Sequence, residues 1–263
     1  MVDIREESAR DGSGDPGSNQ QQSSANSIPI LVQIRSKPLD STLCALRFLT
    51  VVFGFLYAIP IFGPVSQKAT YGKTLMASAA TNGLRLYQRT GRLQFTREYL
   101  TMVMLEDSCH YLFYSIVFLA NAPVTMPLMP VFLFALLHFS SFVLQLFKNA
   151  GMPNHPLANV LGKLVSNYSQ TILSVIATTE IFLMPMAIIF VFMGQSNLFF
   201  PFIYYRFLTM RYVSRRNPST RTALYQMRMG VEHAVSGAGT PAFLRNGVYS
   251  AIAFISRLAP QIA

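Results

Sequence analysis

Five ionisable side chains lie inside or beside strongly apolar segments, and they are the first candidates for catalysis, metal binding or proton transfer. Glu106 and His110 are one helical turn apart, so they share a helix face and could form an acid/base or metal-binding pair. Asp107 lies between them, whereas His138 and Glu180 stand alone in other apolar segments. Because a charge at the centre of a bilayer costs at least about 3 kcal/mol, each residue is a candidate for function or for structural pairing.

The spacing around Glu106 favours a structural role over catalysis. A catalytic metal site needs at least three protein ligands, and no second cluster of such residues occurs at ligand spacing. We expect Glu106, Asp107 and His110 to lie at the membrane interface or to bind cationic residues of neighbouring helices. A membrane enzyme built on these three residues is the less favoured alternative. The chain also lacks a glycine-rich phosphate loop, a nucleophile elbow and a zinc-protease motif, so we expect neither an enzyme nor a cofactor.

Glu180 is the most isolated charge, and we expect it to pair with an arginine. The candidate partners are Arg206, Arg211 and Arg85. A buried pair of this kind more often fixes the register of helices than takes part in turnover. The alternative is an ion or proton channel that uses Glu180 and His138, in which proton flux would disappear in Glu180→Gln.

The elements that position these residues are membrane helices. The chain is 51% hydrophobic and only 12% charged, against roughly 25% charged residues in soluble domains. No charged residue occurs in 48–67, in 111–147 if His138 is neutral, or in 181–205. About 20 helical residues cross the hydrocarbon core of a bilayer, and these runs are continuous rather than alternating as in a membrane barrel. The sequence predicts an all-α polytopic integral membrane protein.

Prolines and glycines predict where these segments break. The first apolar block, 43–65, either spans the membrane or bends back as a re-entrant wedge. Residues 99–147 are expected to form two helices joined by a turn near Pro123 and Pro127, because the residue before a proline is disfavoured in a helix. Residues 164–212 are expected to form one span followed by a short, partly interfacial helix.

Three regions follow from composition: a disordered polar tail (1–35), a transmembrane helical domain (36–212) and a basic amphipathic cytosolic tail (213–263). The amino terminus lacks the pattern of a signal peptide, so an internal segment is expected to direct membrane entry. The formal net charge is +10, and the cations flank apolar segments. Anionic lipid head groups or an acidic protein explain them better than nucleic acid does.

Residues 68–97 are basic and carry an apolar stripe at helical spacing. We expect a helix that lies on the membrane surface. The alternative is a solvated helix whose stripe faces the protein core. The stripe consists of Met76, Ala80, Gly83, Leu84 and Tyr87.

Two further stripes occur in the basic tail, and they are candidates for membrane insertion. The first consists of Leu224, Met227, Val231 and Val235, and the second of Leu244, Val248, Ile252, Ile255 and Leu258. The residues expected to contact lipid head groups or a partner are Arg215, Arg216, Arg245 and Arg257. The alternative for both stripes is packing against another helix.

Six short strings of this sequence, taken in order, resemble the transmembrane protein 33 family, also called the Krüppel homologue 2 family. They are LEDSCHY (105–111), PVTM (123–126), EIFLMP (180–185), PFIYYRFLT (201–209), SRRNP (214–218) and IAFISRLAP (252–260). The resemblance runs from about residue 37 to 260 and leaves out the amino-terminal tail.

The resemblance implies a multi-pass resident of the endoplasmic reticulum membrane and nuclear envelope. It also implies that the protein acts with reticulon-type membrane proteins in shaping tubular membrane. A further implied partner is the set of nuclear pore components. It supplies no catalytic residues. Amphipathic helices and wedge segments are a physical means for such a role, because apolar faces sunk about 5–10 Å into one leaflet expand that leaflet selectively.

Overall fold

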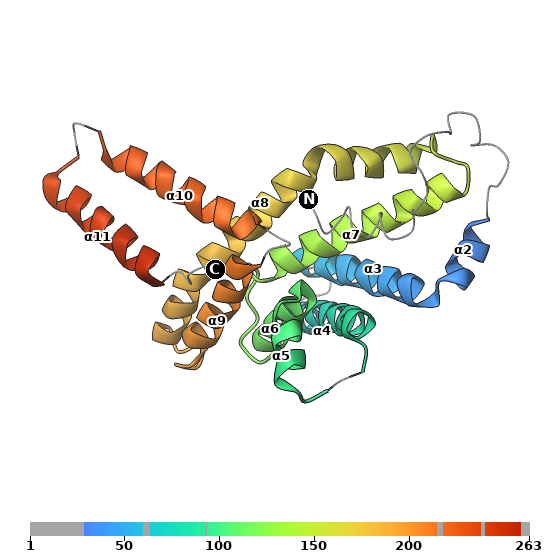
Figure 1. Cartoon of the computed structure of the whole chain (residues 1–263), viewed down its shortest axis with the longest axis horizontal. Helices are drawn as coiled ribbons and strands as arrows, with labels where there is room; N and C mark the ends of the chain where they lie inside the picture. The colour runs from blue at the N-terminus through green and yellow to red at the C-terminus, as the bar shows by residue number, and fades with distance from the viewer. Residues whose placement is uncertain (1–28, 60–63, 93, 215–217, 238–239, 259–263) are drawn as a thin grey trace.

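The computed structural model describes residues 29–59, 64–92, 94–214, 218–237 and 240–258, and the regular structure within them is helical (Figure 1). The prediction of an all-α fold is therefore confirmed. The helices are α2 (Ile30–Ser36), α3 (Pro38–Ala58), α4 (Pro64–Thr90), α5 (Arg97–Met104), α6 (Asp107–Leu119), α7 (Leu128–Asn149), α8 (Pro156–Phe192), α9 (Phe200–Val213), α10 (Ser219–Val235) and α11 (Ala242–Leu258).

Three of these helices are long and apolar enough to cross a membrane: α3, α7 and α8. Helices α5 and α6 are bent by 80° across a short break and together satisfy the same criterion, so the described residues provide three or four crossings. Large apolar side chains remain exposed on the spans, for example Phe55 on α3 and Phe182 on α8. Lipid is the environment in which such outward-facing side chains are stable. The chain is a multi-pass membrane protein.

Local sequence explains where several helices begin and end. Pro38 and Pro156 occupy the first helical position of α3 and α8, where a missing N–H costs nothing. Helices α4, α7 and α8 are followed by Gly91, Gly151 and Gly194, whose φ angles are 70°, 72° and 67°. Glycine is the residue that adopts this left-handed conformation without steric cost, and it ends a helix there.

The predicted breaks in the apolar segments are largely confirmed. Residues 99–147 contain α6 and α7 with a connection at 120–127, and the last apolar region contains α8 followed by the short helix α9. Two boundaries differ from the prediction. Helix α8 begins at Pro156, before the apolar run, and an additional break separates α5 from α6 at Leu105 and Glu106.

The expected disordered tail ends earlier than predicted. Helix α2 begins at Ile30, inside the predicted 1–35 tail, and packs against α3 and α7. Its buried residue is Gln33, whereas Leu31, Val32 and Ile34 are exposed. Residues 1–28 lie outside the described residues.

Helix α4 is a single helix from 64 to 90, and it packs along α3 and α6. The alternative in which its apolar stripe faces the core is wrong: Met76, Ala80 and Tyr87 are exposed, and Gly83 and Leu84 are half-buried. The buried face instead carries Thr74, Ser78, Thr81 and Arg85 together with Tyr71, Leu75, Ala77 and Leu86. The face of α4 that is directed into the protein therefore carries polar and apolar side chains in similar numbers.

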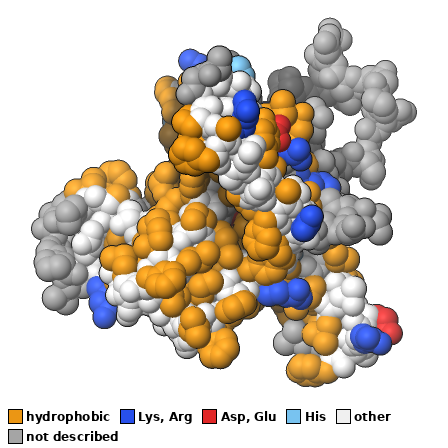
Figure 2. Space-filling model, turned by 90° about the vertical axis from the view of Figure 1, so that its left-hand side faces the viewer, with side chains coloured by type: hydrophobic (Ala, Val, Ile, Leu, Met, Phe, Trp, Pro, Cys, Tyr) orange, Lys and Arg blue, Asp and Glu red, His pale blue; other side chains and the backbone are white. Residues whose placement is uncertain are grey.

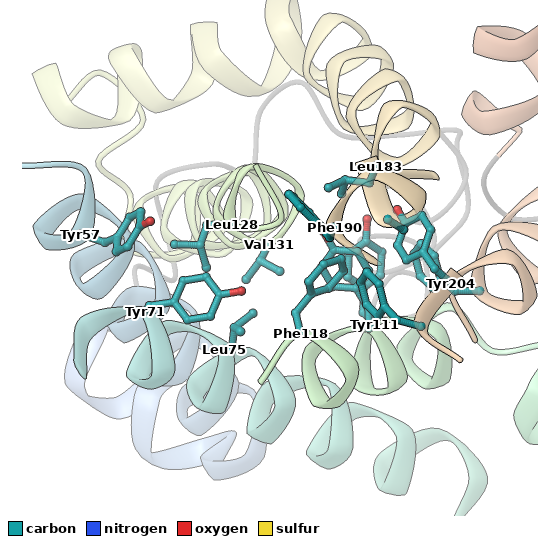
Figure 3. Close-up of a cluster of buried hydrophobic side chains, with 14 residues drawn as sticks. Tyr57, Tyr71, Leu75, Tyr111, Phe118, Leu128, Val131, Leu183, Phe190 and Tyr204 are labelled. Carbon is teal, nitrogen blue, oxygen red and sulfur yellow. The ribbon is translucent and has the colours of Figure 1, made fainter. Parts of the chain in front are cut away.

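The largest apolar core lies where α3, α4, α6, α7, α8 and α9 meet (Figure 3). It is rich in aromatic rings, and Tyr114 is 5.0 Å from Phe207 and 4.6 Å from Phe118, centroid to centroid. Tyr111 and Tyr204 of this cluster carry hydroxyl groups into the bundle (Figure 3). Packing in this core brings polar side chains of α6, α8 and α9 next to one another.

Candidate functional site

A buried charge network joins α6, α8 and α9. The Nε atom of Arg211 donates to Oε2 of Glu180 at 3.1 Å, and its Nη1 donates to Oδ1 of Asp107 at 3.4 Å. The hydroxyl of Tyr111 donates to the other oxygen of Glu180, and that of Ser214 donates to Asp107 at 2.8 Å. The Glu180 side chain is 0% exposed and that of Arg211 is 1% exposed. One arginine thus contacts carboxylates from two other helices.

Aromatic rings enclose the guanidinium of Arg211. Its central carbon lies 5.1 Å from the ring centre of Tyr111 and 5.9 Å from that of Phe134 on α7. Tyr204 adds a hydrogen bond to the backbone carbonyl of Glu180 at 2.8 Å. Burial is the largest single influence and disfavours the charged guanidinium, but Glu180, Tyr111 and Asp107 together outweigh it, so the pKa of Arg211 is raised above its ordinary value. Arg211 is charged at every physiological pH.

The three polar residues at the start of α6 each contact another part of the chain, and Asp107 also lies 3.6 Å from Nδ1 of His110. Glu106 forms an ion pair with Arg89 of α4 at 2.9 Å, and Asp107 binds Arg211. The expectation that these carboxylates bind cations of neighbouring helices is confirmed for both. His110 instead shares a hydrogen bond with the backbone carbonyl of Met104 at 2.7 Å through Nε2. Among the described residues, no three His, Cys, Asp or Glu side chains come together as metal ligands.

Of the three arginines expected to pair with Glu180, the structure selects Arg211. Both carboxylate oxygens of Glu180 are bound, one by Arg211 and one by Tyr111. His138, the second residue of the channel alternative, stacks on Phe134 with ring centres 6.2 Å apart. The arrangement favours a pair that holds α8 and α9 in register.

The two carboxy-terminal stripes have different surroundings. On α10, Ala223 packs with Ala177 and Ile181 of α8, and Leu224 and Met227 lie against this small cluster. Val235 is also buried, whereas Val231 is exposed. Most of the α10 stripe is therefore a packing face, and for this helix the alternative interpretation holds.

Helix α11 has no buried residue. Of its predicted stripe, Leu244, Ile255 and Leu258 are 48%, 57% and 45% exposed, and Val248 and Ile252 are half-buried. The side of the molecule on which α10 and α11 lie carries apolar patches among scattered Lys and Arg side chains (Figure 2). Among the residues that the structure describes, none covers most of this side of α11, although Val248 and Ile252 are partly covered.

Two large residues on this face are absent from the predicted stripe. Phe243 is 78% exposed and Phe254 is 63% exposed. A full helical wheel, which advances about 100° per residue, places both within the same half-circle as Leu244 and Ile255. We define the α11 apolar face as Phe243, Leu244, Val248, Ile252, Phe254, Ile255 and Leu258.

Two of the four arginines expected to contact lipid head groups or a partner are placed. Arg245 and Arg257 are exposed on the polar side of α11. Arg215 and Arg216 lie outside the described residues.

Comparison with known proteins places the chain in a family. The model of the family described as Transmembrane protein 33/Nucleoporin POM33 matches residues 20–261. Transmembrane protein 33 of Homo sapiens is 44% identical over 225 residues, covering 85% of this chain and 91% of its own length. The homologue of Caenorhabditis elegans is 39% identical over 230 residues (87% and 84%), and Krueppel homolog 2 of Drosophila melanogaster is 39% identical over 242 residues (91% and 86%).

No solved structure matches the chain. The family match covers most of the sequence and agrees with the resemblance carried by the six strings. The chain belongs to the Transmembrane protein 33/Nucleoporin POM33 family of membrane proteins.

Proposed function

We propose that this protein is a non-enzymatic membrane-shaping or scaffold protein of the endoplasmic reticulum and nuclear envelope. In this proposal α11 lies in the cytosolic leaflet with its apolar face among the acyl chains. The observation that carries the proposal is that α11, with seven large apolar side chains on one side, has no buried residue.

The chemistry of α11 is that of an interfacial helix. Apolar side chains occupy one half of its circumference, and Arg245 and Arg257 lie on the other half. Such a helix is stable when its apolar face is buried in the boundary between head groups and acyl chains, and cations favour an anionic leaflet. A shallow wedge of this kind expands one leaflet and favours curved membrane.

The rest of the molecule supplies a rigid anchor for this wedge. Helix α10 packs on α8, and the Tyr205 hydroxyl of α9 donates to the backbone carbonyl of Leu258 at 2.8 Å, so both ends of the α10–α11 hairpin contact the bundle. Location in the reticulum and nuclear envelope, and action with reticulon-type proteins and nuclear pore components, are parts of the proposal supported by the resemblance. The family description, which names a nucleoporin, also supports them.

The test is curvature preference of the full-length protein. Fluorescent protein is reconstituted into giant vesicles that contain anionic lipid, and a thin membrane tether is pulled from each vesicle. We expect the protein to be enriched on the tether relative to the vesicle body. The double variant Phe254→Asp/Ile255→Asp should abolish the enrichment, because charged groups on the apolar face cannot enter the acyl region.

The matched control is Asn246→Asp/Ser256→Asp, which adds the same charge to the polar side of α11. This control should retain most of the enrichment. Equal tether enrichment of the wild type and of Phe254→Asp/Ile255→Asp would remove the role proposed for α11.

A further inference from the structure

A groove of about 570 Å³ lies between α5 and α9, and Leu258 of α11 also lines it. One face of α5 forms the first wall, with Arg97, Leu100, Thr101 and Met104 at helical spacing. One face of α9, from Tyr205 to Val213, forms the opposite wall, and Leu258 is the contribution of α11. The volume is within the range of roughly 300–1,000 Å³ that is usual for ligand pockets.

The lining of this groove is mostly apolar and is cationic at two positions, and its other polar members are Thr101, His110, Thr209 and Ser214. Leu100, Met104 and Leu105 are more than half exposed, so the described protein does not cover them. The two cations are Arg97 and Arg206, both exposed, and no Asp or Glu lines the groove. Neither guanidinium forms an ion pair with any residue that the structure describes. The groove therefore combines uncompensated positive charge with uncovered apolar surface.

A second groove of about 480 Å³ lies on the other side of Tyr205 and Leu258, which line both grooves. Its remaining lining consists of Met184, Ile188, Val191, Phe192, Leu198, Pro201 and Phe202. All of these side chains are apolar, and they belong to the end of α8, the start of α9 and the connection between them. An acyl chain is the ligand that such a surface suits in a membrane protein.

We propose that the α5–α9 groove is a binding site for one anionic phospholipid molecule. Arg97 and Arg206 bind the phosphate, since guanidinium groups form strong charge-assisted hydrogen bonds with phosphate oxygens. One acyl chain lies along Leu100, Met104 and Leu105, and the apolar groove beyond Tyr205 receives the other chain. A zwitterionic lipid binds more weakly, because its head group carries no second anion to offset the ammonium, so its net charge toward the two arginines is zero.

This site goes beyond the proposed membrane-shaping function and does not depend on it. The phospholipid is bound by α5 and α9, whereas curvature preference depends on the exposed face of α11. The bound lipid would contact Leu258 at the end of α11, so it would also fix where the α10–α11 hairpin meets the bundle.

The test is native mass spectrometry of the full-length protein purified in detergent and titrated with dioleoyl phosphatidylserine. We expect one tightly bound molecule per chain and weaker binding of dioleoyl phosphatidylcholine. The variant Arg97→Gln/Arg206→Gln should weaken binding of phosphatidylserine about 30-fold, since each cation near a lipid head group contributes about a factor of five.

Two controls separate the groove from general electrostatics and from misfolding. Arg92→Gln/Arg228→Gln removes the same charge from exposed positions outside the groove and should leave binding unchanged. Leu100→Glu should weaken binding, whereas Met102→Glu, on the same helix but outside the groove lining, should not.

Two results would overturn the proposal. The first is unchanged binding in Arg97→Gln/Arg206→Gln, or an equal loss in its charge-matched control. The second is full displacement of the lipid by inorganic phosphate at the same concentration, which would make this a site for a soluble phosphate. Loss of tether enrichment on mutation of α11 with intact lipid binding would separate the two proposals.

Discussion

At the scale of single residues, the helical bundle depends on one buried cation, Arg211, which forms ion pairs with two carboxylates. Glu180 and Arg211 are fully buried, and the Asp107 side chain is 13% exposed. Two carboxylates would be unstable together in an apolar bundle without a cation between them. Tyr111 and Ser214 satisfy further acceptor positions on these carboxylates. The network therefore fixes the relative positions of α6, α8 and α9.

Arg211→Met should destabilise the protein strongly. The substitution preserves the length of the side chain but leaves the carboxylates of Glu180 and Asp107 without their cation. Breaking a buried pair in this way costs about 3–5 kcal/mol of unfolding free energy. The measurement is the midpoint of thermal unfolding in detergent, and it should fall by several degrees or more. The control Arg206→Met, at an exposed position of the same helix, should change the unfolding midpoint little. Equal midpoints for the two variants would contradict this account.

Part of this charge network is predictable from the sequence. An isolated glutamate in an apolar segment requires a cation, and Arg211 was one of three candidates. The sharing of Arg211 with Asp107 was not predictable, because the two residues are 104 positions apart and meet only through the packing of α6 on α9. The hydroxyl of Tyr111 was missed for the same reason, since nothing local distinguishes it from other core tyrosines.

At the scale of elements, α4 shows that an apolar stripe at helical spacing does not by itself identify the buried face of a helix. In a soluble protein the apolar stripe of a helix faces the core. Here Met76 and Tyr87 face outward, and Thr74, Thr81 and Arg85 face the neighbouring helices. The stripe was visible in the sequence, but periodicity alone does not say which side meets the protein.

The break between α5 and α6 was also missed, because neither proline nor glycine occurs between Met104 and Asp107. The chain bends by 80° there, and Glu106 at the bend forms its ion pair with Arg89. A tertiary contact with α4 therefore accompanies a break that local propensity does not encode. By contrast, Pro123 and Pro127 predict the break before α7 from the sequence, and the positive φ angles of Gly151 and Gly194 explain where α7 and α8 end.

The close contact between α3 and α7 at Gly54 predicts that a larger residue there destabilises the protein. A Cβ atom at this position would lie 2.8 Å from Cδ2 of Phe132, so Gly54→Ala should push the helices apart. We expect a loss of about 1–3 kcal/mol in stability, typical of overpacking. Gly72→Ala is the matched control, because its Cβ would lie 3.9 Å from Leu119. Thermal unfolding in detergent measures both, and a Gly54→Ala variant as stable as Gly72→Ala would disprove the close contact.

At the scale of the whole molecule, a packed helical body carries a hairpin whose outer helix is uncovered. Figure 1 shows α10 and α11 extending to one side, with α11 returning toward α9. The charge network lies in the body and holds its helices in register, whereas the exposed apolar surface of α11 lies outside it. The body therefore anchors the protein in the membrane, and α11 is the element that can act on one leaflet.

The most direct test of this account is the depth of α11 in the bilayer. Ile255→Cys and Asn246→Cys place a thiol on opposite sides of α11, since positions nine residues apart differ by about 180° on the helical wheel. With Cys44 and Cys109 replaced by alanine, each variant is labelled with an environment-sensitive fluorophore and reconstituted with nitroxide-bearing lipids. The account predicts strong quenching of the label at position 255 and weak quenching at position 246. Equal, weak quenching at both positions would show that α11 does not enter the membrane and would contradict the proposed function.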